Sequence, residues 1–99
     1  MADFVLSKLA DQDLEDIAAY TVLNFGINEA LEYKASIAQS AKTAAHFPSI
    51  GKPYTTQKGH VFQRYNIGRH ALFYQPTEAG IFIVRILHQM MDLDRHLDE

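Results

Sequence analysis

The chain has 99 residues, 47% of them hydrophobic and 21% charged, which is enough for one folded domain and is not a disordered composition. Twelve acidic residues against nine basic ones give a net charge of −3. This balance argues against a protein that binds nucleic acid directly, because such proteins cluster Lys and Arg against phosphates. We find no signal-peptide pattern and no membrane-spanning apolar run, so we expect a cytoplasmic protein without a membrane partner. The absence of cysteine excludes disulfides and thiolate chemistry.

The chain begins with a short strand pattern and then changes to a helical period. Residues 2–6 are an apolar run, and Ser7 after them is a candidate helix N-cap. From Lys8 onward one side of a helix is apolar, as expected for a helix that packs on a core; its residues are Ala10, Leu14, Ile17, Ala18, Thr21 and Phe25. The acidic residues of this helix are predicted to face solvent; they are Asp11, Asp13, Glu15 and Asp16.

A second helix is predicted from about Glu29 to His46. Gly26 supplies the stop of the first helix and Asn28 a cap for the second, so the two helices should form an antiparallel hairpin. The expected buried stripe of the second helix consists of Ala30, Tyr33, Ile37, Ala41 and Ala44, widened by Leu31, Ala35, Ala38 and Ala45. Pro48 prevents continuation of the helix. Residues 48–60 contain two prolines and two glycines without any period, and they are predicted to be the longest loop.

The last third of the chain has the two-residue period of strands. Residues 61–67 and 70–75 read as a hairpin about a Gly68-Arg69 turn, and residues 76–80 lead into a third strand at 81–88. The predicted fold is a single α+β domain over residues 1–99 with the order β-α-α-β-β-β. It has an antiparallel sheet that packs against the N-terminal helical hairpin, with the first strand at one edge.

The residues do not form a recognisable catalytic or metal-binding motif. The five histidines lack the spacing of a zinc site, no nucleotide-binding glycine pattern or catalytic triad is present, and we expect no metal and no cofactor. Ribonuclease chemistry would need a compact group of cations with an acid and a base. The candidates are scattered along the chain; they are Lys52, Lys58, Arg64, Arg69 and Arg85, with His60 or His70. Arg85, inside an apolar strand, is either a buried, paired cation or a contact residue.

Several segments, in order, resemble the ParE toxins of the RelE/ParE superfamily, the toxic halves of bacterial type II toxin-antitoxin modules. They are LSKLADQDLEDIAAY (6–20), FG (25–26), Tyr33, FPSIGKP (47–53), IGRHALFY (67–74) and IVRILHQMMDLDRHL (83–97). The resemblance implies the same β-α-α-β-β-β fold that the periodicity predicts. It departs from the family pattern at Gln75, where relatives often carry an arginine.

The resemblance also implies a function. ParE-type toxins poison DNA gyrase, and a ParD-like antitoxin neutralises them by wrapping a segment around the toxin in a hetero-oligomer. This implies a binding protein without catalytic residues. Two alternatives stay open: a RelE-like ribosome-dependent mRNA endoribonuclease, and a degenerate toxin that only binds its antitoxin.

Two sets of contact residues follow as predictions. The antitoxin, a segment that folds on binding, should need apolar contacts along the seam between the hairpin and the sheet; the candidates are Tyr20, Leu23, Phe25, Tyr54, Arg64, Tyr65, Arg69 and Phe82. The C-terminal segment is the candidate for gyrase binding and toxicity, with Arg85, His88, Met90, Met91, Arg95, His96 and Leu97. Met90, Leu93 and Leu97 should form one face of a short docked helix, with ion pairs Asp92–His96 and Arg95–Glu99 opposite.

Overall fold

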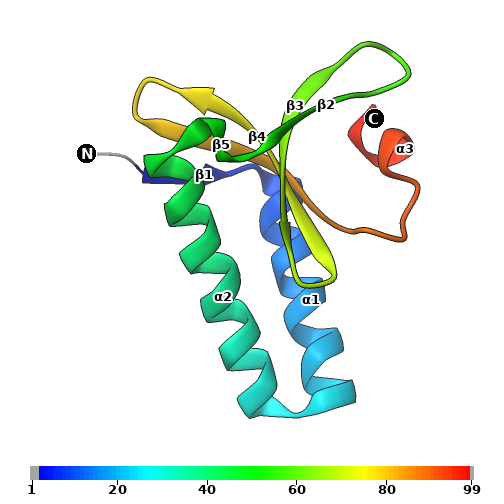
Figure 1. Ribbon diagram of the computed structural model, residues 1–99. Helices are drawn as coiled ribbons and strands as arrows, with labels where there is room; N and C mark the ends of the chain where they lie inside the picture. The colour runs from blue at the N-terminus through cyan, green and yellow to red at the C-terminus, as the bar shows by residue number, and fades with distance from the viewer. Residues whose placement is uncertain (1–2, 99) are drawn as a thin grey trace.

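The computed structural model describes residues 3–98 and contains one five-stranded sheet with a helical hairpin on one face and a short helix on the other (Figure 1). The strand order in the sheet is β1-β5-β4-β3-β2. The elements are β1 (Asp3–Leu6), α1 (Lys8–Phe25), α2 (Ile27–His46), a 3₁₀ turn η1 (Pro48–Ile50), β2 (Lys52–Thr55), β3 (Val61–Ile67), β4 (His70–Thr77), β5 (Gly80–His88) and α3 (Leu93–Leu97). Within residues 3–98, no helix is long and apolar enough to cross a membrane.

The α+β class and the β3-β4-β5 meander are confirmed, and two details of the sheet differ from the prediction. β1 lies at an edge, as expected, but pairs with β5 in parallel, with Phe4 opposite Ile81. The predicted loop at 48–60 contains β2, which pairs with β3 and places Tyr54 opposite Phe62. Four residues are too few to show a period of two, and Pro53 is tolerated because β2 is an edge strand.

The helical hairpin is built as the sequence indicates, except at its link. Ser7 caps α1, since its hydroxyl accepts a hydrogen bond from the Ala10 amide at 2.9 Å and donates to the Val84 carbonyl at 2.6 Å. Gly26 alone joins the two helices, with φ of +91°, a conformation that favours glycine. The prediction that Asn28 caps α2 is wrong, because this single residue reverses the chain and α2 already begins at Ile27.

The main core lies between the hairpin and the sheet. Its central buried residues come from α2, β4 and β5; they include Ile37, Ala41, Leu72, Ile81, Ile83 and Ile86. The predicted places of Phe25, Leu31 and Ala35 in this core are wrong, because all three are exposed. The end of the hairpin around Gly26 projects away from the sheet (Figure 1).

A buried ion pair joins α1 to β5. The Arg85 guanidinium donates to both carboxylate oxygens of Asp13, at 2.8 Å from Nε and 2.9 Å from Nη2, and the Ile86 amide donates to the same carboxylate at 3.0 Å. Arg85 is 8% exposed, so its structural reading is confirmed. The prediction that Asp13 faces solvent is wrong. β1 ends at Leu6, and beyond that point the Asp13 carboxylate accepts the hydrogen bond of the Ile86 amide on β5.

A second core lies on the other face of the sheet, beneath α3. Leu97 is buried there with Phe62, Phe73 and Leu87. The carboxylate of Asp94 accepts from the Tyr54 hydroxyl at 2.5 Å and from the Gln57 amide at 2.9 Å. The docked C-terminal helix that the sequence predicts is therefore present.

The details of this C-terminal segment differ from the prediction. Met90 lies before the helix and is 86% exposed, so it does not share a helix face with Leu93 and Leu97. Asp92 is the N-cap, accepting from the Arg95 amide at 3.3 Å, which replaces the predicted pair with His96 because a helix begins directly after it. The predicted partner of Arg95, Glu99, lies outside the described residues, as does Ala2 of the first predicted strand.

Candidate functional site

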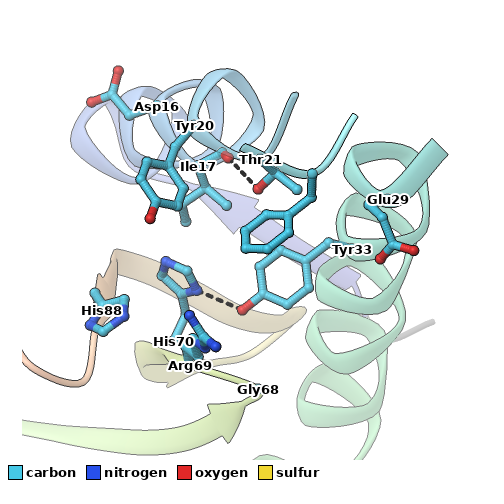
Figure 2. A pocket seen from close by; sticks show the side chains of 11 residues that line it. Asp16, Ile17, Tyr20, Thr21, Glu29, Tyr33, Gly68, Arg69, His70 and His88 are labelled. Carbon is cyan, nitrogen blue, oxygen red and sulfur yellow. Dashed lines mark hydrogen bonds between the residues drawn. The ribbon is translucent and has the colours of Figure 1, made fainter. Parts of the chain in front are cut away.

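A pocket of about 500 Å³ lies where the distal half of the hairpin faces the β3–β4 turn (Figure 2). Its lining comes from α1, α2, the turn and the ends of β4 and β5: Asp16, Ile17, Tyr20, Thr21, Phe25, Glu29, Tyr33, Gly68, Arg69, His70 and His88. This volume is within the range of ligand-binding pockets, which combine apolar walls with a few polar groups. The pocket exists because the helices extend past the sheet, and the turn with the ends of β4 and β5 forms its other side.

Tyr33 and His70 form the hydrogen-bonded centre of the pocket (Figure 2). The Tyr33 hydroxyl donates to the Ile67 carbonyl at 3.1 Å and lies 2.5 Å from His70 Nδ1. A phenol has one hydrogen, so the direction of the bond between Tyr33 and His70 depends on which ring nitrogen of His70 carries its proton. Burial raises the pKa of Tyr33, and burial followed by the neighbouring His88 lowers the pKa of His70. Both groups are therefore held neutral at physiological pH.

The remaining polar groups at the strand ends are also fixed by the backbone. His88 Nδ1 accepts from the Met90 amide at 3.0 Å, which fixes the orientation of the ring. The rings of His70 and His88 meet edge to face, with centroids 5.2 Å apart. Gly68 has φ of +53°, and a Cβ there would lie 3.2 Å from the Tyr33 ring. The turn can thus approach α2 closely only with glycine at this position.

This arrangement is suited to binding rather than to covalent chemistry. Tyr33 and His70 at its centre are neutral and bonded to each other, most of the other walls are aromatic and aliphatic, and the charged groups Asp16, Glu29 and Arg69 lie around them. Within residues 3–98, no three His, Asp or Glu side chains are placed to hold a metal ion. The three arginines considered for ribonuclease chemistry are dispersed: Arg85 is buried against Asp13, Arg69 lies at the pocket, and Arg64 lies near Tyr54 and Phe73 on the opposite face of the sheet. Lys52 is opposite Arg64 in the β2–β3 pair.

The structure divides the predicted antitoxin contacts between two faces. Tyr20, Phe25 and Arg69 line the pocket, and Leu23 is 85% exposed at the hairpin end. Tyr65 packs against the main core. The other predicted contacts lie away from the seam; they are Tyr54 and Arg64, which approach Phe73 beneath α3, and Phe82, which points to the face opposite buried Ile81 and Ile83.

The predicted toxicity residues also separate into surface and interior positions. Arg85 and Leu97 are buried, so neither is available for a surface contact and both stabilise the fold. His88 lines the pocket. His96 is partly buried, and its carbonyl lies 3.4 Å from Arg85 Nη1. Met90, Met91 and Arg95 are the exposed members of this set.

The sequence prediction missed the centre of the pocket. Tyr33 was expected in the helix core and His70 at a strand end, and neither was expected to contact the other. The Gly68-Arg69 turn is the one signal that could have located the pocket, because a tight turn facing a helix hairpin brings strand ends toward it. Ile27 was also missed, although it is a large apolar side chain exposed at the hairpin end.

Comparisons with known proteins agree with one another. The family model of the ParE toxin of the type II toxin-antitoxin system, parDE, matches residues 4–93. Toxin ParE1 of Mycobacterium tuberculosis is 35% identical over 95 residues, which cover 95% of this chain and 96% of that protein. Toxin ParE1 of Caulobacter vibrioides is 30% identical over 97 residues, covering 98% of this chain and 99% of that protein.

A solved structure shows the same fold. The chromosomal ParDE TA system from P. aeruginosa contains a chain that superposes with a TM-score of 0.70 at 18% identity, covering 89% of this chain and 96% of that one. The family match spans nearly all of the described residues, from β1 to the start of α3. The chain therefore belongs to the ParE toxin family of type II toxin-antitoxin systems.

Proposed function

We propose that this protein is a toxin that inhibits DNA gyrase, and so DNA replication, in the bacterial cytoplasm, and that a ParD-like antitoxin neutralises it by direct binding. The observation that carries the proposal is the match to the ParE family over residues 4–93. The name of the P. aeruginosa neighbour, a ParDE system, supports an antitoxin of the ParD type as the partner in a hetero-oligomer.

The distribution of cations supports a toxin that acts by binding. A ribonuclease needs several cations around one phosphate together with an acid and a base. Here Arg64 and Arg69 belong to opposite faces of the sheet, and Arg85 is neutralised by Asp13. The three arginines therefore do not surround one phosphate; Lys52 lies opposite Arg64 in the β2–β3 pair, and the chain is net acidic.

The pocket and the hairpin around it are the surface that we propose for the antitoxin. A segment that orders on binding must bury apolar area to offset the entropy that it loses. Tyr20, Phe25 and the exposed Leu23 offer such area beside a pocket that can receive one side chain. For the target, we propose the exposed C-terminal residues Met90, Met91 and Arg95, with His96 at their border.

Two assays with the purified full chain test the proposal. Supercoiling and gyrase-dependent DNA cleavage are measured beside a translation reaction in which primer extension detects cut messages. We expect inhibited supercoiling and intact messages. Cleaved messages with fully active gyrase would instead identify the ribosome-dependent endoribonuclease. Expression without antitoxin provides a third readout, because normal growth would identify a degenerate toxin.

The contact residues are tested separately from the activity. Arg95→Ala should reduce gyrase inhibition while the variant stays folded and bound to antitoxin, and Phe25→Ser should weaken antitoxin binding while gyrase inhibition persists. Lys58→Ala, an exposed residue outside both proposed surfaces, is the matched control. Equal effects of Lys58→Ala and Arg95→Ala on supercoiling would remove the C-terminal assignment.

A further inference from the structure

Several of the large exposed apolar side chains of this protein gather at one end of the molecule. We call this surface the hairpin end and define it by Tyr20, Leu23, Phe25, Ile27 and Leu31, each more than half exposed. They surround the Gly26 link, and Figure 1 shows this part of α1 and α2 projecting away from the sheet. An apolar group of this size at a projecting end is typical of a protein-binding surface.

Between Lys8 and Lys34, the charged residues of the hairpin are all acidic. Residues 9–33 contain six acidic residues and no lysine or arginine; the acids are Asp11, Asp13, Glu15, Asp16, Glu29 and Glu32. The rest of the chain carries nine basic residues against six acids. Acidic and basic residues are therefore concentrated in different parts of the sequence, although the net charge is only −3. Within the described residues, Asp13 is the one member of the six that is ion-paired. Asp16, Glu29 and Glu32 are the acids toward the pocket and the apolar end, whereas Asp11, Asp13 and Glu15 lie in the first half of α1, away from Gly26. The acidic border of the hairpin end therefore consists of Asp16, Glu29 and Glu32.

The pocket adjoins the hairpin end and shares two of its residues. Tyr20 and Phe25 belong to both surfaces, and Asp16 and Glu29 stand at the helical side of the pocket (Figure 2). Its cationic and histidine groups, Arg69, His70 and His88, come from the sheet side. A partner that reaches the pocket from the hairpin end thus meets aromatic walls and acids before it meets the sheet.

We propose that the hairpin end is a docking surface for a protein partner that presents an amphipathic helix with apolar residues bordered by lysine and arginine. Complementary charge selects such a partner and speeds its association, while the apolar contacts supply the affinity. A second copy of the same surface is disfavoured, because it would bring the two acidic borders together. The inference rests on the proposed function in that Tyr20, Leu23 and Phe25 belong to the surface proposed there for the antitoxin, and it adds the chemistry of the helix that this surface would bind.

The test uses the full chain and two synthetic helical peptides. One peptide has a leucine and phenylalanine face bordered by lysines, and the other has a glutamate in place of each lysine. A scrambled lysine peptide, with the same composition but no apolar face, measures general charge attraction. Binding is followed by calorimetry and by amide shifts in ¹⁵N-labelled toxin, at low salt and at about 0.5 M salt, where charges are strongly screened.

The lysine peptide should shift amides of residues 20–31 and bind about tenfold or more tightly than either other peptide at low salt, with the advantage falling at high salt. Leu23→Ser should weaken binding of the lysine peptide about fivefold or more. The double variant Glu29→Lys with Glu32→Lys should bind the lysine peptide no more tightly than the glutamate peptide. Val61→Ser and Glu78→Lys, exposed changes outside the hairpin, are the matched controls and should leave binding unchanged.

Equal binding of the lysine and glutamate peptides, shifts that map to another surface, or an equal loss in the Val61→Ser control would overturn the inference. Supercoiling inhibition is measured on the same preparations. If gyrase is inhibited but no peptide binds at the hairpin end, the inference fails and the proposed function stands. If the peptides bind as expected but gyrase is unaffected, the proposed function fails and the docking surface stands.

Discussion

The Asp13–Arg85 pair should be the most sensitive single contact in the fold. Asp13→Ala removes the acceptor of two guanidinium hydrogen bonds and of the Ile86 amide, and it leaves an arginine that is 8% exposed without its carboxylate. Breaking one side of a buried pair costs about 3–5 kcal/mol. For a domain of this size, that loss lowers the melting temperature by about 12 °C or more. Urea unfolding followed by circular dichroism measures the free energy.

Companion variants separate the charge from the backbone contact. Asp13→Asn keeps an oxygen for the Ile86 amide, so combining it with Arg85→Met should recover most of the loss, since replacing both charges is often close to neutral. Asp16→Ala, an exposed acid on the same helix, should change stability by less than about 0.5 kcal/mol. A loss under about 1 kcal/mol in Asp13→Ala, or an equal loss in Asp16→Ala, would refute the reasoning.

Three further changes test other parts of the structure. Gly80→Ala should prevent β1 from pairing, because its Cβ would lie 1.7 Å from the Asp3 carbonyl oxygen at φ of +151°; amide exchange would detect the loss, and native protection of β1 would contradict it. Burial and His88 hold the pKa of His70 below 6.5, so the stability that neutral His70 provides is complete above that pH and falls as the pH drops through the lowered pKa; His70→Gln should flatten the unfolding free energy over this range, whereas His46→Gln, on the exposed end of α2, should not. Burial alone would raise the pKa of Asp98, but hydrogen bonds from Thr56, His60 and the Lys58 amide lower it below 3.8, so its contribution is present above that pH and is lost as the pH falls through the lowered value; Asp98→Asn should remove this acid dependence, and an unchanged pH profile would show that Asp98 does not hold α3.

The sequence predicted the parts of the fold that depend on local pattern. The change from helical to alternating period located the hairpin and the meander, and Ser7 was identified as a cap because capping needs only its own neighbours. Asp13 and Asp16 could not be distinguished, since both lie in the same acidic stretch and only the fold brings Arg85, 72 positions later, against one of them. The sequence prediction missed β2, because four residues that include a proline are too few to show the two-residue period of a strand.

The candidate site was predicted in part for the same reason. Tyr20 and Phe25 were named from their position near the end of the first helix, and both line the pocket. The contact between Tyr33 and His70 joins residues 37 positions apart, and its geometry depends on the close approach of Gly68 to α2. Arg85 and Leu97, which were predicted to be contact residues for toxicity, are buried in the structure. Residue type and spacing alone do not show whether residues such as Arg85 and Leu97 are buried in the core or exposed on the surface.

The attachment of α3 has a consequence for what would be exposed if it came away. Asp94 and Asp98 bind the segment between β2 and β3, and Leu97 completes the cluster of Phe62, Phe73 and Leu87. These contacts join residues about 40 positions apart, so α3 acts as a cover over one face of the sheet. Detachment of this five-residue helix would open the second core to solvent without breaking the main core on the other face.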